Sequence, residues 1–208
     1  RIEHFVARRA MDITIGPETI SLLFDKDLIN DIADLYALTY DDIINLERWG
    51  ETSTNNLLKS IEQSKSIPYE RVLFALGIRF VGETVANKLA NAFPTIEKLK
   101  SATFEELMSV DEIGERIAQS VVYFFNNEAY LGIVNRLQSY GLQLSLSEDE
   151  LSLKTDKLEG KTIVISGVFS LHSRDEYKEM IVQNGGKNTG SISKRTDYLL
   201  AGARMGPS

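Results

Sequence analysis

The stretch FVGETVANKL, residues 80–89, places an apolar residue, a glycine and the start of a helix-forming run directly one after another. The same order returns in RWGETSTNNL, which begins at residue 48, and in EIGERIAQSV, which begins at residue 112. A fourth glycine of this kind stands in ITIGPETI, so the repeated glycines fall at positions 16, 50, 82 and 114. Self-similarity at a nearly fixed spacing indicates that one supersecondary unit is repeated along the chain.

A longer repeat contains these shorter ones. Residues 32–62 align with residues 96–126 without a gap, and apolar positions meet apolar positions throughout. We therefore expect the two segments to fold alike, and the chain to contain four helix–hairpin–helix units in tandem. Each unit has a short helix, an apolar turn and a second helix that starts after the glycine. Thr39 and Thr103 are expected to cap two of the first helices.

A different pattern follows residue 142. Residues 143–157, QLSLSEDELSLKTDK, are polar and poorly periodic, which predicts a linker. KTIVISGVF then has the composition of a buried strand, SRDEYKEMIVQ predicts a helix that ends at two glycines, and two short strands follow. The expected architecture is mainly α over residues 1–142, then this linker, then an incomplete α/β domain with a parallel sheet over residues 158–208.

Charge and composition limit the possible functions. The 208 residues carry a net charge of −7, and residues 1–140, with 14 basic and 21 acidic side chains, account for the whole excess. A broad basic surface for nucleic acid is therefore not expected, and any binding must depend on a few well-placed donors. The chain has no cysteine, only two histidines and no apolar run of the ~20 residues that a membrane span needs. A cytoplasmic protein without a metal cluster is expected.

The repeated glycine suggests how such local donors arise. A helix N-terminus presents unpaired N–H groups and a partial positive charge, and a preceding glycine lets a phosphate come close to them. Backbone donors of this kind grip a nucleic acid without reading its sequence. The expected contacts are Gly16, Gly50, Glu51, Thr52, Gly82, Glu83, Thr84, Gly114 and Glu115. The nearby basic residues expected to help are Arg48, Arg79, Lys88 and Arg116.

A plainer interpretation stays open beside this one. A glycine before a helix is common, and Glu51, Glu83 and Glu115 are ordinary partners of a helix dipole. The acidic repeats would then be a packed helical scaffold for protein interactions. An enzyme in its own right is not supported, because His4 and His172 have no acid–base or nucleophilic partners nearby in sequence.

The segments ARRAMDI, LERWGETSTNNLLKSIEQSK and RVLFALGIRFVGETVANKLA resemble the C-terminal part of bacterial NAD-dependent DNA ligases. The resemblance runs in order over essentially the whole chain, and GKTIVISGVFSLHSRDEYKEMIVQNGGK resembles the BRCT domain of that family. It implies that the chain is a C-terminal fragment, with the helix–hairpin–helix domain and part of the BRCT domain. Under the scaffold interpretation, the BRCT part would dock a partner protein.

The resemblance also implies a role. The family seals nicks in duplex DNA during replication and repair: NAD adenylates a lysine, AMP passes to the 5′-phosphate, and the 3′-hydroxyl is joined. It places NAD, magnesium, a structural zinc and the catalytic lysine upstream, so no catalytic residue or cofactor is expected in this chain. The implied partner is nicked double-stranded DNA, with a protein or DNA end for the BRCT part, in a monomeric, cytoplasmic, nucleoid-associated bacterial protein.

The chain departs from the family pattern in two sets of positions. Two residues before the repeated glycine, where the pattern has another glycine, stand Thr14, Arg48, Phe80 and Glu112. Four residues after it, where the pattern has a small residue, stand Ile20, Thr54, Ala86 and Ala118. Because Ile20 is large, the first hairpin is expected to be the weakest candidate for DNA contact.

The BRCT resemblance suggests one more site. BRCT domains that bind phosphate use a Ser or Thr at the end of the first strand, which falls on Ser166 before Gly167. They add a lysine from a later helix, which this sequence does not reach. A strand-end hydroxyl that is satisfied within the protein is the alternative interpretation of Ser166.

Overall fold

The computed structural model describes residues 1–153 and 155–203, which form two compact units, Arg1–Leu146 and Ser147–Ser208. Residue 154 of the predicted linker and residues 204–208 of the predicted second domain lie outside the described residues. The predicted fold class is confirmed: helices dominate the first unit, and the second contains a small parallel sheet.

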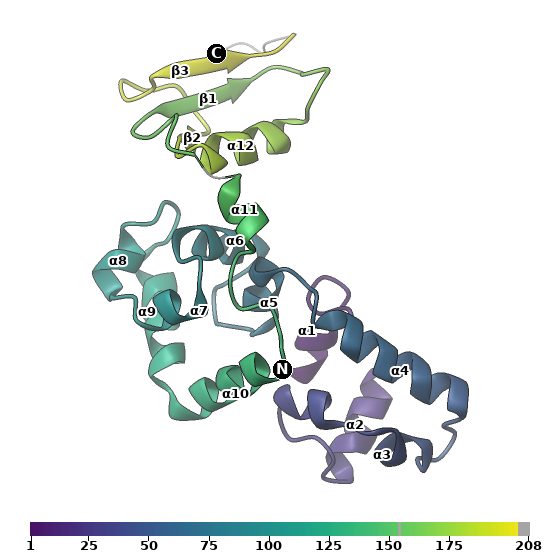
Figure 1. The fold of residues 1–208 in the computed structure, drawn as a ribbon. Coiled ribbons are helices and arrows are strands. Elements are labelled where there is room, and N and C mark those ends of the chain that lie inside the picture. The colour runs from purple at the N-terminus through teal and green to yellow at the C-terminus, as the bar shows by residue number, and fades with distance from the viewer. Residues whose placement is uncertain (154, 204–208) are drawn as a thin grey trace. The chain divides into compact units, whose positions relative to one another are not determined.

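The first unit consists of helices joined by short turns (Figure 1). They are α1 (Ile2–Val6), α2 (Pro17–Asp25), the 3₁₀ helix η1 (Ala33–Ala37), α3 (Tyr40–Ile44), α4 (Glu51–Ser64), α5 (Tyr69–Ala75), α6 (Glu83–Ala92), α7 (Ile96–Lys100), α8 (Phe104–Met108), α9 (Glu115–Asn126) and α10 (Glu128–Ser139). Helices α2, α4, α6 and α9 begin at the residue after a repeated glycine, as the sequence predicts. We name the four turns hairpins 1 to 4 after Gly16, Gly50, Gly82 and Gly114.

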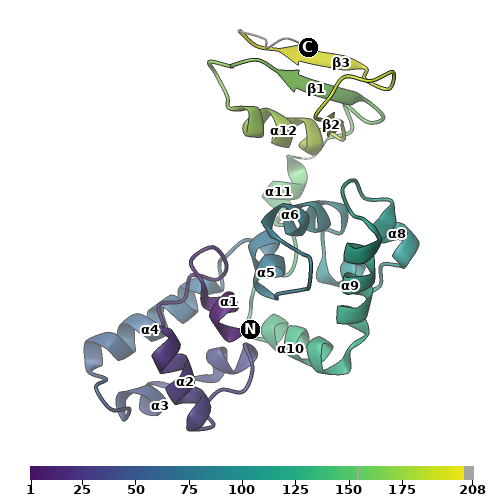
Figure 2. The ribbon, with the colours of Figure 1, turned by 180° about the vertical axis from the view of Figure 1, so that it is seen from behind.

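The long repeat is visible as two groups of helices within this unit. Figures 1 and 2 show α1 to α4 gathered on one side and α5 to α10 on the other. The aligned apolar positions face a common core. Ile43 of α3 and Leu107 of α8 are both fully buried, and the aligned Leu35 and Leu99 are at most 1% exposed. Burial of equivalent side chains explains why two segments of different sequence adopt the same arrangement.

Polar contacts fasten the two groups to each other. The Nε2 atom of His4 in α1 lies 2.8 Å from the carbonyl oxygen of Phe74 in α5. Arg136 of α10 donates to Asp31 at 3.0 Å and to Asp34 of η1 at 2.6 Å. The first unit is therefore held together by side-chain contacts between its halves as well as by its apolar core.

The predicted linker starts too early. Leu144 and Leu146 are buried, the N–H of Ile96 donates to the carbonyl of Leu144, and the N–H of Leu146 donates to the carbonyl of Pro94. Residues 143–146 thus pack as an extended segment on the first unit. Their polar residues alternate with leucines, and this period of two is the mark of a half-buried extended chain that the composition concealed.

The second unit contains α11 (Glu148–Ser152), β1 (Thr162–Ser166), α12 (Arg174–Gln183), β2 (Lys187–Thr189) and β3 (Tyr198–Ala201). Both outer strands run parallel to β1, in the order β2-β1-β3, so the predicted β–α–β connection is confirmed. Helix α12 ends at the predicted glycine pair. Gly185 has φ +81°, its N–H donates to the carbonyl of Val182, and that of Gly186 donates to the carbonyl of Ile181, which is a Schellman motif.

Candidate nucleic-acid interface

The four repeated glycines share an open environment. All are exposed, and their φ angles between −85° and −118° are extended values that any residue adopts. A Cβ atom built on any of them would meet no protein atom within 4 Å. Neither backbone strain nor internal packing explains glycine at these positions. What glycine does provide is free space directly in front of a helix N-terminus.

The donors behind this space have no side-chain cap. Gly50, Gly82 and Gly114 are the N-cap residues of α4, α6 and α9, and none of these helix starts has a side-chain capping bond. The first N–H groups of a helix have no acceptor within the helix itself. The partial positive charge of these N-termini therefore faces the open space in front of each glycine.

Hairpins 2 to 4 share a left-handed residue two positions before the repeated glycine. Arg48, Phe80 and Glu112 have φ angles of +68°, +67° and +65°, the left-handed region that favours glycine. These three residues therefore adopt a conformation that glycine favours, although none of them is glycine. Non-glycine residues in this region cost roughly 1 kcal/mol each, so the shape is imposed by the surrounding fold.

Hairpin 1 differs from the others. The residue with a positive φ is Asp12, at +52°, rather than Thr14. Pro17 occupies the first position of α2 and has no N–H to donate. These two differences agree with the expectation that hairpin 1 is the weakest candidate for phosphate contact.

The position four residues after each glycine faces inward. Ala86 and Ala118 are fully buried, and Ile20 is buried as well, with 7% exposed. Thr54 is also fully buried, and its Oγ1 atom has no hydrogen-bond partner among the residues that the structure describes. Hairpin 2 therefore contains a polar atom where hairpins 3 and 4 contain only a methyl group.

The predicted basic residues fall into two groups. Arg48, Arg79 and Arg116 are exposed beside their hairpins. Lys88 is only 28% exposed at its side chain and forms an ion pair of 3.4 Å with Glu112. Lys88 is thus engaged within the protein, between the helix of hairpin 3 and the turn of hairpin 4.

The acidic and hydroxyl residues that follow the glycines are exposed, namely Glu51, Thr52, Glu83, Thr84 and Glu115. Two of the carboxylates have cationic or amide neighbours. Glu83 lies 3.9 Å from Arg9, and Glu115 accepts a hydrogen bond of 3.1 Å from Gln119. The Arg9 guanidinium partly offsets the charge of the Glu83 carboxylate.

A basic hollow beside hairpin 3 was missed by the sequence analysis. It has a volume of about 460 Å³ and is lined by Arg8, Arg9, Glu70, Arg71, Phe74, Glu83 and Asn87. Arg71 donates a 2.8 Å bond to the carbonyl of Arg8, which brings these distant parts of the chain together. The adjacent arginines in ARRAMDI were the available signal, but only the fold places Arg71 and the start of α6 next to them.

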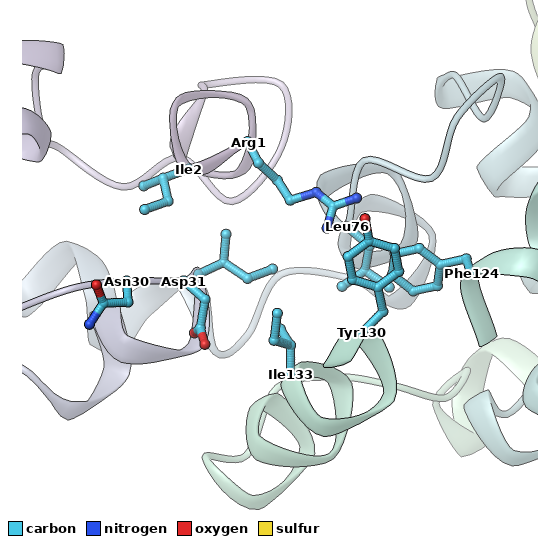
Figure 3. Close-up of a pocket in the computed structure, with 9 residues that line it drawn as sticks. Arg1, Ile2, Asn30, Asp31, Leu76, Phe124, Tyr130 and Ile133 are labelled. Atoms are coloured by element: carbon cyan, nitrogen blue, oxygen red, sulfur yellow. The ribbon is translucent and has the colours of Figure 1, made fainter. Parts of the chain in front are cut away.

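A second hollow, of about 200 Å³, has a different character (Figure 3). The guanidinium of Arg1 lies 4.2 Å from the ring centroid of Tyr130, and Asp31 is paired with Arg136. Asn30 and apolar side chains from Ile2, Ile32, Leu76, Phe124 and Ile133 complete the lining. The charged side chains of Arg1 and Asp31 already have protein partners, so the hollow presents no pair of groups arranged for proton transfer or nucleophilic attack.

The histidines have structural neighbours. His4 contacts Phe74, and His172 lies edge-on to Tyr177 with 5.4 Å between ring centroids. Within residues 1–153 and 155–203, no group of three metal-ligating side chains is close enough to hold an ion. In that same part of the chain, no helix has the length and apolar character needed to cross a membrane.

The strand-end site of the second unit is tightly packed around its glycine. Ser166 pairs with Ala201 in the sheet, and its carbonyl accepts from the N–H of Gly202. Gly167 has φ +98°, and a Cβ atom there would lie 2.8 Å from the carbonyl oxygen of Gly202. The positive φ and this close contact explain why residue 167 is glycine without any ligand. The role of Ser166 toward a phosphate stays a prediction.

Comparison with known proteins agrees with both units. Residues 71–134 match the helix-hairpin-helix motif, and residues 153–205 match the BRCA1 C Terminus (BRCT) domain. The chain is 59% identical to the DNA ligase of Parabacteroides distasonis, 57% to that of Phocaeicola vulgatus and 56% to that of Bacteroides fragilis. Each similarity covers 100% of this chain and 31% of the relative.

The chain thus spans about a third of the length of these relatives. The helix-hairpin-helix match covers hairpins 3 and 4, and the repeat extends the same architecture to hairpins 1 and 2. The chain carries a helix–hairpin–helix domain and a BRCT domain, and it is homologous along its whole length to part of the bacterial DNA ligases.

Proposed function

We propose that this chain is the non-catalytic DNA-binding part of an NAD-dependent ligase that seals nicks in duplex DNA during replication and repair. The observation that carries the proposal is the open space at the repeated glycines. A Cβ at Gly50, Gly82 or Gly114 would meet nothing within the protein, so the space suits an outside ligand. The ligand that suits uncapped helix N-termini is an anion, here the DNA phosphate.

The grip follows from paired helix starts. Each start supplies backbone N–H donors and a partial positive charge, and successive hairpins supply two such starts to the same ligand. The preceding side chains Val81 and Ile113 are buried, so they fix these turns to the core. Backbone donors contact phosphate oxygens without reading base edges, so binding is expected to be independent of sequence.

The finer parts of the proposal come from the resemblance of the sequence to NAD-dependent DNA ligases. NAD, magnesium, a structural zinc and the adenylated lysine would belong to residues outside this chain. Nicked duplex DNA would be the partner, held by a monomer associated with the nucleoid of a bacterial cell. The acidic net charge of residues 1–140 fits a grip by a few local donors better than attraction by a broad basic surface.

A protein-interaction scaffold is the second candidate. The second unit exposes apolar side chains, with Val168 63%, Leu171 84% and Ile192 60% exposed. A docking role for the BRCT part, through these residues or through a phosphate on Ser166 and Gly167, would not need open hairpins. The two candidates differ in what they require of Gly82 and Gly114.

The test is a titration of the chain with nicked and intact duplex DNA over a series of salt concentrations. We expect Gly82→Asp with Gly114→Asp to weaken binding at least about tenfold, because each carboxylate fills the phosphate space with like charge. Aspartate is a good N-cap, so the melting temperature should not fall. Gly132→Asp within α10 adds the same charge away from the hairpins and is the matched control.

Each outcome separates the two candidates. Binding that falls with salt, ignores sequence and is lost only in the hairpin variants supports the DNA clamp. Equal binding by the double variant and the unmodified chain would assign the glycines to helix initiation alone. That result would favour the scaffold.

A further inference from the structure

The aromatic ring of Phe80 is exposed next to the start of α6. It is 47% exposed, and its residue has φ +67° in the turn of hairpin 3. A bulky residue in this region is a true outlier, because its Cβ crowds the backbone where glycine would fit freely. Burial of the ring does not explain why phenylalanine is kept here at that cost.

Two guanidinium groups gather on this ring. The Cζ atom of Arg79 lies 4.9 Å from the ring centroid, and the Cζ atom of Arg116 lies 5.6 Å from it. Both distances are within the range of a cation–π contact. Arg79 belongs to the turn of hairpin 3, whereas Arg116 belongs to the first turn of α9 after Gly114. One aromatic ring therefore joins the cations of two consecutive hairpins.

The neighbouring carboxylates are engaged elsewhere. Glu112 is paired with Lys88 at 3.4 Å, and Glu115 accepts from Gln119. Within the part of the chain that the structure describes, neither Arg79 nor Arg116 forms an ion pair. Two arginines that share a ring and have no carboxylate partner keep their N–H edges available for an outside anion.

We propose that Phe80 is a positioning residue that holds Arg79 and Arg116 toward the phosphates of one DNA strand as it passes from hairpin 3 to hairpin 4. The proposal rests on the proposed DNA-binding function and adds side-chain cations to the backbone donors. A guanidinium that lies over an aromatic ring loses freedom before binding, so less entropy is lost when it meets a phosphate. Phe80 itself need not touch the DNA.

A double-mutant cycle on the full chain tests this. The dissociation constant for one intact duplex is measured at fixed low salt for the unmodified chain, Phe80→Gly, Arg116→Gln and the double variant. We expect each single change to weaken binding about two- to fivefold. The dissociation constant of the double variant should rise by clearly less than the product of the two single fold-changes. The reason is that both changes disrupt the same arrangement.

Thermal unfolding of the same proteins separates positioning from folding. Glycine relieves the left-handed strain, so Phe80→Gly should melt at the same temperature as the unmodified chain or higher. Glu112→Gly relieves the same strain in hairpin 4 without removing a ring, and it should not weaken binding. Phe80→Trp keeps an aromatic face and should retain the affinity.

The outcomes are distinct from those of the proposed function. Unweakened binding by Phe80→Gly, additive effects in the cycle, or a fall in the melting temperature of Phe80→Gly would each overturn the role of the ring while leaving the DNA clamp intact. No binding by the folded, unmodified chain at low salt would overturn the proposed function and this inference with it.

Discussion

Two kinds of helix start within the first unit differ in what their first N–H groups contact. Thr39 and Thr103 open α3 and α8 with capping boxes, in which each hydroxyl accepts from the third N–H of the helix and the acidic residue there accepts from the threonine N–H. Gly50 and Gly114 open α4 and α9, the second helices of the same hairpins, without any side-chain cap. The two kinds of start alternate along a single repeat.

The difference shows which helix N-termini have their N–H groups satisfied inside the protein and which leave them accessible. A capped start satisfies its N–H groups inside the protein, which stabilises the helix by about 1 kcal/mol. A glycine start gives up only a few tenths of a kcal/mol of that stabilisation, and it leaves its donors accessible. Since serine or aspartate would serve at least as well at the N-caps of α4, α6 and α9, the repeated choice of glycine points to a ligand rather than to folding.

The largest expected effect concerns the packing beneath a glycine start. Ala118 is fully buried four residues after Gly114, so Ala118→Leu should lower the free energy of unfolding by about 2 kcal/mol through overpacking. Chemical denaturation measures this directly. At the equivalent position of hairpin 1, Ile20→Leu keeps the volume and should cost less than about 1.5 kcal/mol. A cost for Ala118→Leu no larger than that for Ile20→Leu would contradict the tight packing that the structure shows at Ala118.

A third kind of start, at η1, is closed by carboxylates. Asp31 accepts from the N–H groups of Ala33 and Asp34, while Asp34 accepts from those of Asn30 and Asp31. Burial alone raises the pKa of Asp34, but its bonds from Arg136 and from the backbone outweigh burial and hold the pKa below its ordinary value. A carboxylate with a lowered pKa stabilises the fold at pH values above its unfolded pKa of about 4, and this contribution is lost as pH falls through the folded pKa.

Arg136→Met tests this charged start. It should lower the free energy of unfolding at neutral pH by about 1 kcal/mol, a modest value because the Arg136 side chain is 41% exposed and partly screened. It should also make the fall in stability between about pH 5 and pH 2 shallower. Denaturation curves over that range measure both effects. The same pH slope in both proteins would mean that Arg136 does not hold the Asp34 carboxylate in its charged form.

A crossed pair of substitutions addresses the two main kinds of start. Thr103→Ala removes the capping box and should lower the free energy of unfolding by about 1 kcal/mol without changing DNA affinity. Gly114→Ala should also lower the free energy of unfolding, by roughly 0.5–1 kcal/mol because alanine is a poor N-cap residue, and it should in addition weaken DNA binding because a methyl group enters the phosphate space. Thermal unfolding measures the stability of both variants, and DNA titration over a salt series measures their affinity. If both variants lost stability alike and bound alike, the two kinds of start would be equivalent.

The sequence predicted the parts of the molecule that repeat. The position of each glycine, the threonine caps and the parallel β–α–β connection all follow from local patterns, and the structure confirms them. It could not predict that Lys88 pairs with Glu112, or that Arg71 meets Arg8, because these contacts depend on how hairpins pack. The positive φ of Phe80 was hidden for a related reason: the surrounding fold imposes a glycine conformation on a residue that does not favour it.

The smallest expected effect concerns hairpin 2, where Thr54 replaces the alanine of hairpins 3 and 4. Its buried Oγ1 atom has no hydrogen-bond partner within the described part of the chain, and an unsatisfied buried hydroxyl is destabilising. Thr54→Val keeps the shape of the side chain and removes the polar atom, so it should raise the free energy of unfolding by roughly 0.5–1 kcal/mol. Ser53→Val, at the preceding exposed position of α4, tests whether valine alone has this effect and should not stabilise the chain. Since Thr54 lies beneath the glycine start and not in front of it, DNA affinity should remain unchanged. A loss of stability would mean that the Thr54 hydroxyl is satisfied within the fold, and hairpin 2 would then differ from its neighbours by a bond it makes rather than one it lacks.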